Sequence, residues 1–307
     1  MTLLIDIGII ILCILALWYG AIWIVGSATR IARRTGLSEL IIGLTVVALG
    51  TSAPEFAVTL VSAFNGQSDI SVGNIVGSNI FNLGFILGGV ALVSVVKTTR
   101  PLIHRDGAAL LVSSLILLFF LRDLTLSRLE GGIFVALLIG YVLYLISQGQ
   151  DMGDEIPEGE FSPLDVGRLI AGLALIVGGG HFLVESASEI ARFAGISEWV
   201  IGVTIVAAGT SAPEMATSLT AVLRGQHGLS AGNLIGSDLF NVLGVLGVAG
   251  MIQPLQVDAE AIESVLMLSG MILLVLLMLR SRWELSRWEG GLLVLIGVAR
   301  WLFDFLG

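Results

Sequence analysis

A twenty-residue segment occurs twice in this 307-residue chain, 159 positions apart. Residues 36–55 align without a gap with residues 195–214, and 14 of the 20 pairs are identical. At the same offset, residues 71–82 align with residues 230–241, and seven of these 12 pairs are identical. Self-similarity at a fixed offset indicates a duplicated structural unit, so we expect a fold made of two related halves.

The composition indicates that the chain is embedded in a membrane. Hydrophobic residues make up 56% of the chain and charged residues only 13%, whereas about one quarter of an ordinary soluble domain is charged. A transmembrane helix needs about 20 mostly apolar residues, and ten segments fit this description. They are Ile5–Val25, Leu40–Asn65, Ile70–Val96, Gly107–Leu121, Glu130–Ser147, Val166–Glu185, Trp199–Leu223, Leu229–Ile252, Ala261–Leu279 and Glu289–Leu306.

Ten spans and two sequence copies indicate a repeat of five helices. Because five is odd, the second copy enters the membrane from the opposite side. Inverted repeats are common in transporters, with the substrate site near the midplane where the repeats meet. We therefore predict an all-α polytopic membrane protein with ten transmembrane helices in two inverted five-helix repeats, residues 1–147 and 165–307. Residues 148–164 form an acidic linker between them.

Basic residues predict the orientation in the membrane, because cytoplasmic loops carry an excess of lysine and arginine. Eleven of the 15 basic residues fall on one side of the predicted topology, the side that also carries the linker. We expect that side to be cytoplasmic and both termini to lie outside. Such short loops are typical of a bacterial or archaeal inner (plasma) membrane protein. The four basic residues on the other side are Arg122, Arg128, Arg192 and Arg300.

Each copy carries one carboxylate deep in an apolar segment. Glu55 is the only ionisable residue in 40–65, and Glu214 is the only one in 199–223. A charge at the centre of a bilayer costs about 2.5 kcal/mol or more, so an intramembrane carboxylate is by default a functional-site hypothesis. Its occurrence at matched positions of both copies strengthens that hypothesis.

The residues around each glutamate predict a broken helix lined with oxygen atoms. In Gly50-Thr51-Ser52-Ala53-Pro54-Glu55 the proline removes one backbone donor and clashes with the preceding turn. Unpaired backbone is tolerated at this depth only where it is buried or lines a cavity. We therefore expect helices 2 and 7 to break at this motif, leaving carbonyls, hydroxyls and one carboxylate from each half. An all-oxygen set with two carboxylates suits a hard divalent cation such as calcium.

The next helix of each copy adds uncharged polar groups. Ser78 and Asn82 are four residues apart and share a helix face, and their repeat partners are Ser237 and Asn241. Asn74 and Asn233 are expected mainly to hydrogen-bond between helices. One position differs in charge, since Asn79 of the first copy is Asp238 in the second. Asp238 is either a third titratable cation ligand or an off-axis residue paired with a polar neighbour.

The two Gly-Thr-Ser-Ala-Pro-Glu segments, each followed by Gly-Asn-x-x-Gly-Ser-x-x-x-Asn, resemble the signature repeats of the sodium/calcium exchanger branch of the calcium/cation antiporters. The short central linker is similar to that of prokaryotic members. The resemblance implies that Glu55 and Glu214 bind both calcium and sodium, and that Thr51 and Thr210 give backbone carbonyls to calcium. It also implies flanking sodium ligands and residues that line the centre of the site, which are Ser52, Ser78, Ser211, Ser237, the carbonyls of Ala48 and Ala207, and Asn82 and Asn241.

In the potassium-dependent branch the position of Asn241 is an aspartate, so the asparagine here disfavours potassium dependence. Asp238 is a departure from the family pattern. The function expected from the resemblance is exchange of calcium for sodium by alternating access, at one midplane site shared by the two repeats. A proton-coupled calcium antiporter on the same scaffold is the alternative, with Glu55, Glu214 or Asp238 carrying the proton.

Other classes of function fit the sequence less well. A cation channel is disfavoured because no pore ring of repeated carboxylates is visible, and an enzyme because the spans show no nucleophile–base pair or histidine metal motif. The net charge of −9 disfavours a nucleic-acid partner. We expect no cofactor and no obligatory protein partner; the expected substrates are calcium and sodium ions, and the surroundings are lipid.

Overall fold

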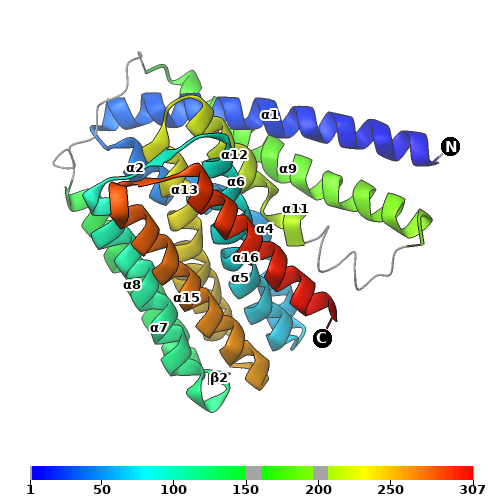
Figure 1. Ribbon diagram of the computed structural model, residues 1–307, viewed down its shortest axis with the longest axis vertical. Coiled ribbons are helices and arrows are strands. Elements are labelled where there is room, and N and C mark those ends of the chain that lie inside the picture. The colour runs from blue at the N-terminus through cyan, green and yellow to red at the C-terminus, as the bar shows by residue number, and fades with distance from the viewer. Residues whose placement is uncertain (1, 149–160, 196–206, 307) are drawn as a thin grey trace.

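The computed structural model describes residues 2–148, 161–195 and 207–306, and these are almost entirely helical (Figure 1). In the first half the elements are α1 (Thr2–Thr35), α2 (Glu39–Ile42), η1 (Gly43–Val47), α3 (Ala48–Thr51), α4 (Ala53–Phe64), α5 (Ser68–Phe81), η2 (Asn82–Leu87), α6 (Gly88–Val93), β1 (Val96–Lys97), η3 (Leu102–Gly107), α7 (Ala108–Phe120), η4 (Leu121–Asp123), β2 (Thr125–Leu126) and α8 (Arg128–Gln148). In the second half they are α9 (Leu164–Phe193), α11 (Ala207–Thr210), α12 (Ala212–Leu223), α13 (His227–Leu239), η6 (Phe240–Val245), α14 (Leu246–Ile252), β3 (Leu255–Gln256), α15 (Ala259–Arg282), β4 (Glu284–Leu285) and α16 (Arg287–Leu306).

Seven of the described helices are long and apolar enough to cross a membrane, and a bent pair of helices makes an eighth candidate. The multi-pass helical architecture is therefore confirmed, while the number ten stays a prediction. Part of the predicted span 199–223 lies outside the described residues, as does most of the predicted linker 148–164. The predicted tenth span, 289–306, coincides with α16.

The predicted break in helix 2 is confirmed. Residues 40–51 and 53–64 form two helical pieces inclined at 50° to each other. Ser52 lies at the break with φ −79° and ψ 12°, and Pro54 is in the first turn of α4, where its missing N–H leaves no hydrogen bond unmade. The second copy repeats this arrangement, because α11 ends at Thr210 and α12 begins at Ala212.

Wider π-helical turns interrupt the helices next to these breaks, and the sequence did not predict them. Asn82 begins the π-helical segment η2, and Asn241 lies in its counterpart η6. Residues of η1 and η3 adopt the same geometry. Single π turns inside α-helices are frequent at functional sites, and here they occur at asparagines that the sequence had assigned to the site.

Helices α1 and α9 pack side by side, inclined to the bundle that contains α7, α8 and α15 (Figure 1). Glycines permit their close approach, because a Cβ atom on Gly20 would lie 2.9 Å from the backbone oxygen of Gly172. The main hydrophobic core lies elsewhere, where buried side chains of α5, α7, α13 and α15 meet. The fold therefore contains a two-helix unit and a larger packed bundle.

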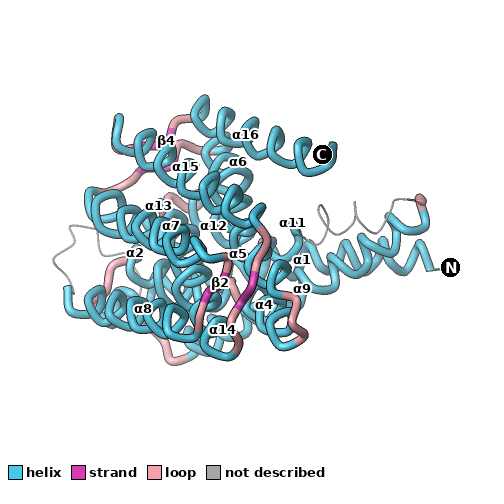
Figure 2. Tube along the Cα trace, turned by 90° about the horizontal axis from the view of Figure 1, so that it is seen from below, coloured by secondary structure: helices cyan, strands magenta, loops and turns pink. Residues whose placement is uncertain are grey.

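Among the described residues, four two-residue strands form two small antiparallel ribbons, which an all-α prediction does not include. Val96 of β1 pairs with Leu285 of β4, and Leu126 of β2 pairs with Leu255 of β3. The two pairings are related by the 159-residue offset of the sequence repeat. The 24-residue helix α15 separates β3 from β4, so the ribbons lie roughly 36 Å apart along its axis. Figure 2 shows β2 and β4 well separated.

Candidate functional site

The two intramembrane glutamates are completely buried. Glu55 lies in the first turn of α4 and Glu214 in the first turn of α12, each directly after a helix break. The amino-terminal end of a helix carries a partial positive charge, which favours a carboxylate there. The duplicated motif thus places each carboxylate at a helix start inside the protein.

The serines of the two motifs connect the repeats through crossed hydrogen bonds. Ser52 Oγ donates to Oε1 of Glu214 at 3.1 Å, and Ser211 Oγ donates to Oε1 of Glu55 at 3.1 Å. Each glutamate is therefore held by the serine of the opposite copy. Both serines are fully buried, so the two motifs form one polar cluster inside the protein.

Thr51 and Ser237 extend this cluster. The hydroxyl of Thr51 lies 3.3 Å from that of Ser237, and Ser237 donates to Oε1 of Glu214 at 3.3 Å. Thr51 is also 3.2 Å from the backbone oxygen of Ala48. The structure brings these residues of both repeats together, as the sequence analysis expected.

The remaining expected residues lie on helices that carry or flank the two motifs. Thr210, the repeat partner of Thr51, is only partly buried, whereas Thr51 is fully buried. Ser78 is buried one turn before Asn82 in α5. Ala207 begins the short helix α11. The two halves of the site are thus similar but not identical.

Two asparagines donate hydrogen bonds to the backbone beside the helix breaks. Asn74 Nδ2 donates to the backbone oxygen of Glu55 at 3.3 Å, and Asn233 Nδ2 donates to that of Glu214 at 3.4 Å. The expected interhelical hydrogen bonds of these asparagines are confirmed. The sequence did not predict the second partners of these asparagines, which are Thr59 Oγ1 at 3.0 Å and Ser218 Oγ at 2.9 Å. Their equal 159-residue spacing was the signal that could have identified them.

Asp238 is paired with polar neighbours, as one of the two sequence hypotheses proposed. Asn82 Nδ2 donates to Oδ1 of Asp238 at 2.9 Å, and Asn79 Nδ2 donates to its backbone oxygen at 3.0 Å. Asn241 Nδ2 donates to Oδ1 of Asn79 at 2.9 Å. All four residues are fully buried, and their hydrogen bonds again connect one repeat with the other.

Five buried oxygen atoms of these residues have no hydrogen-bond partner within the described part of the chain. Leaving a buried polar atom unpaired costs about 1–3 kcal/mol, and more for a charged group. All five are acceptors, and calcium prefers carboxylate and amide oxygens, so the donor set fits a hard cation. The atoms are Glu55 Oε2, Glu214 Oε2, Asn82 Oδ1, Asn241 Oδ1 and Asp238 Oδ2.

Metal sites of the usual kind are not found in the described residues, since no three histidine, cysteine, aspartate or glutamate side chains are grouped to hold an ion. A site here must therefore take neutral amide and hydroxyl oxygens in addition to the glutamates. Such a mixed oxygen set excludes a soft-metal preference.

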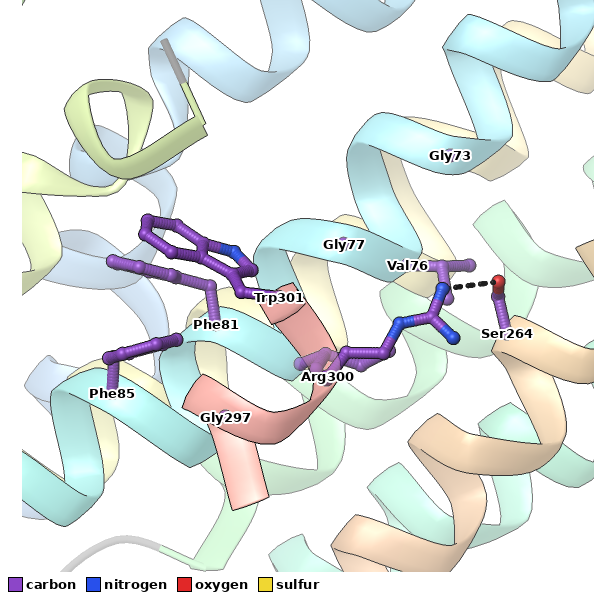
Figure 3. A pocket seen from close by; sticks show the side chains of 10 residues that line it. Gly73, Val76, Gly77, Phe81, Phe85, Ser264, Gly297, Arg300 and Trp301 are labelled. Atoms are coloured by element: carbon purple, nitrogen blue, oxygen red, sulfur yellow. Dashed lines mark hydrogen bonds between the residues drawn. The ribbon is translucent and has the colours of Figure 1, made fainter. Parts of the chain in front are cut away.

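A cavity of about 240 Å³ lies away from the glutamates, between α5, α15 and α16 (Figure 3). Phe81, Phe85 and Trp301 line one side of it, and Arg300 donates to Ser264 Oγ at 3.4 Å on the other. None of the residues assigned to the cation site lines this cavity. This cavity is thus separate from the cation cluster, whose two glutamates are fully buried.

Comparison with known proteins decides the family. Residues 5–147 and 164–299 match the sodium/calcium exchanger protein family. The chain belongs to this family. It is 35% identical to the putative antiporter CaxA of Alkalimonas amylolytica, over 99% of this chain and 98% of that protein. It is 33% identical to the sodium/calcium exchanger MaX1 of Methanosarcina acetivorans, over 95% of this chain and 96% of the relative.

Two further relatives agree with this assignment. The inner membrane protein YrbG of Escherichia coli is 33% identical, over 97% of this chain and 98% of that protein. The solved structure of the sodium–calcium exchanger NCX_Mj superposes with a TM-score of 0.85 at 29% identity, covering 97% of this chain and 98% of the other. The protein is therefore a multi-pass membrane transporter of the exchanger family and not a member of an enzyme family.

Proposed function

We propose that this exchanger moves calcium against sodium by alternating access, through one site shared by its two repeats. The observation that carries the proposal is the crossed pair of hydrogen bonds, Ser52 to Glu214 and Ser211 to Glu55. They support a single site in two halves, because each half fixes the carboxylate of the other. The name of the family and of the relative MaX1 support sodium and calcium as the ions.

The charges of the site support competition between the two ions. The two carboxylates of Glu55 and Glu214 balance the charge of one calcium ion. Several sodium ions also balance the charge of these carboxylates. We propose that calcium and sodium occupy these carboxylates alternately, so that release of one ion permits binding of the other. The proposed ligands are Glu55, Glu214, Asn82 and Asn241, the carbonyls of Thr51, Thr210, Ala48 and Ala207, and the hydroxyls of Ser52, Ser78, Ser211 and Ser237. Asp238 belongs to the same cluster as the hydrogen-bond partner of Asn82.

The proposed architecture is ten spans in two inverted repeats, residues 1–147 and 165–307, joined by the linker 148–164. The strand pairing supports it. By the sequence offset β3 is the counterpart of β1, yet β1 pairs with β4, at the far end of α15 from β3. Equivalent strands of the two copies therefore lie at opposite ends of the bundle, which is the expected result of inversion.

For the membrane orientation we propose cytoplasmic placement of the linker and external placement of both termini, in an inner membrane. Contacts that basic residues make with other predicted cytoplasmic segments support this orientation. Arg30 lies 2.8 Å and Arg168 3.2 Å from the carboxylate of Asp165, at the start of α9. Arg100 stacks on Trp283 beside the β1–β4 ribbon. Basic residues from both repeats thus take part in contacts at segments assigned to the cytoplasmic side.

The proposal is tested by calcium uptake into liposomes that contain the purified protein. Uptake driven by an outward sodium gradient, with pH equal on both sides, is the expected result. Uptake that needs a pH gradient and ignores sodium supports the proton-coupled alternative. Flux that does not saturate and needs no counter-ion contradicts exchange altogether.

A further inference from the structure

The side-chain amide of an asparagine has an acceptor end, the oxygen, and a donor end, the NH₂ group. The orientation of each amide in the cation cluster therefore decides whether it attracts or repels a cation. Asn82 and Asn241 help to bind a cation only if their oxygen atoms face it. In the structure both Oδ1 atoms are buried and take no hydrogen bond from the described residues. Something must hold the amide groups in this orientation.

Asp238 supplies two groups that can only accept hydrogen bonds, a carboxylate oxygen and its backbone carbonyl. The Asp238 carboxylate accepts a hydrogen bond from Asn82 Nδ2 at 2.9 Å. The amide oxygen of Asn82 therefore points away from Asp238. The backbone oxygen of Asp238 accepts a hydrogen bond from Asn79 Nδ2 at 3.0 Å. The Asn79 side-chain oxygen is then free to accept a hydrogen bond from Asn241 Nδ2 at 2.9 Å. The orientation of all three amides follows from one residue.

We propose that Asp238 is a positioning residue, which turns the amide oxygens of Asn82 and Asn241 toward the transported cation. This inference rests on the proposed function. Helix α12, which carries Glu214, packs against η2, which begins at Asn82. An Asn82 amide turned the other way presents its NH₂ group to this region, where it hydrogen-bonds the carboxylates and competes with the cation.

The asymmetry between Asp238 and Asn79 then has a physical reason. One acceptor-only side chain, that of Asp238, is sufficient to orient the amides. Asn79 is oriented by its hydrogen bond to Asp238, and Asn79 in turn orients Asn241 through a second hydrogen bond. An aspartate at position 79 in addition to Asp238 removes the donor to the Asp238 carbonyl and places a further negative charge among fully buried groups, where unpaired charge is costly. The two copies differ here because the cluster needs one such anchor.

The decisive experiment measures calcium uptake and calcium binding by two variants of the cluster, together with Glu214→Gln as a test of the proposed function. In Asp238→Asn both ends of the new amide can face Asn82, so we expect the KM for calcium to rise about tenfold as flipped Asn82 competes with the cation. We expect kcat to stay within about twofold, because Glu55 and Glu214 are unchanged. In Asn79→Asp combined with Asp238→Asn the anchor moves to the equivalent position of the other repeat, so KM returns to the wild-type value.

Each outcome bears on the inference. An unchanged KM in Asp238→Asn overturns it, and so does a raised KM that the double variant leaves uncorrected, since Asp238 then acts only at its own position. If Asp238→Asn fails to fold, as judged by unfolding temperature without calcium, the double variant alone decides by its KM. Calcium binding that survives in Glu214→Gln overturns the proposed function; its loss there, with normal KM in Asp238→Asn, overturns only this inference.

Discussion

The hydroxyl of Ser52 lies 3.1 Å from Oε1 of Glu214, although 162 residues separate them. The mirrored bond from Ser211 to Glu55 has the same length. Neither motif satisfies its own carboxylate with its own serine; each depends on the other copy. The cation site is therefore a product of the duplication, since half of the protein supplies only half of the contacts.

Removing both serine hydroxyls tests this dependence. Hydrogen bonds to charged groups contribute about 1.5–3 kcal/mol, so we expect Ser52→Ala with Ser211→Ala to weaken calcium binding about tenfold or more. Isothermal titration of the purified protein measures this change. Ser113→Ala is the matched control, because Ser113 is buried but donates only to the backbone of its own helix. Equal affinities of the double variant and the control contradict the account.

Alternating access requires part of the protein to move, and we expect the α1–α9 unit to slide against the bundle that carries the site. Cross-linking tests this motion. Gln226 donates to Thr29 of α1 at 2.7 Å, which connects α1 to the segment before α13. In a Cys13→Ala background, joining Thr29→Cys to Gln226→Cys with a short thiol reagent is expected to lower turnover about tenfold or more, because the lateral motion is blocked. Reversal of the cross-link restores it.

The control for this experiment lies within the moving unit. A Cβ atom on residue 179 of α9 lies 3.3 Å from Cβ of Ala16 in α1, close to the spacing of a disulfide. Ala16→Cys joined to Gly179→Cys fixes α1 to α9 alone, so transport is expected to continue. Normal turnover with Thr29 and Gln226 joined is the result that rules out this motion.

Packing between α1 and α9 is tested by a change of stability. A Cβ atom on Gly172 meets the Gly20 backbone oxygen at 2.9 Å, and overpacking of this kind costs about 1–3 kcal/mol. We expect Gly172→Ala to lower the unfolding temperature in detergent. Gly178→Ala on the same helix meets nothing within 4 Å and is expected to leave stability unchanged or slightly higher. Identical behaviour of the two variants contradicts the proposed close contact.

The sequence predicted those parts of the site that depend on local chemistry. The break at Ser52 follows from the glycine and proline around it, and the burial of Glu55 follows from its apolar segment. Because the second copy repeats the same residues, the same arguments applied to Glu214. The family resemblance then assigned most of the polar residues that the structure gathers around the two carboxylates.

The sequence did not predict the contacts that depend on how the two copies meet. Ser52 stays a predicted sodium ligand, and the hydrogen bond from its hydroxyl to Glu214 is a contact that the sequence did not predict. The bond between Asn82 and Asp238 spans 156 residues and leaves no local pattern. The π-helical segment η2 begins at Asn82 and packs against α12, α13 and α16 of the other repeat. Only the unequal pair Asn79 and Asp238 signalled in the sequence that the copies interact unequally.

The number of calcium ions that bind to the wild-type protein and to Glu55→Gln and Glu214→Gln tests the central claim most directly. A site made of two halves predicts one calcium per wild-type chain and none in either variant, while Glu189→Gln, at an exposed ion pair with Arg192, binds normally. Two calcium ions in the wild type, with one retained in each glutamate variant, contradict the shared site.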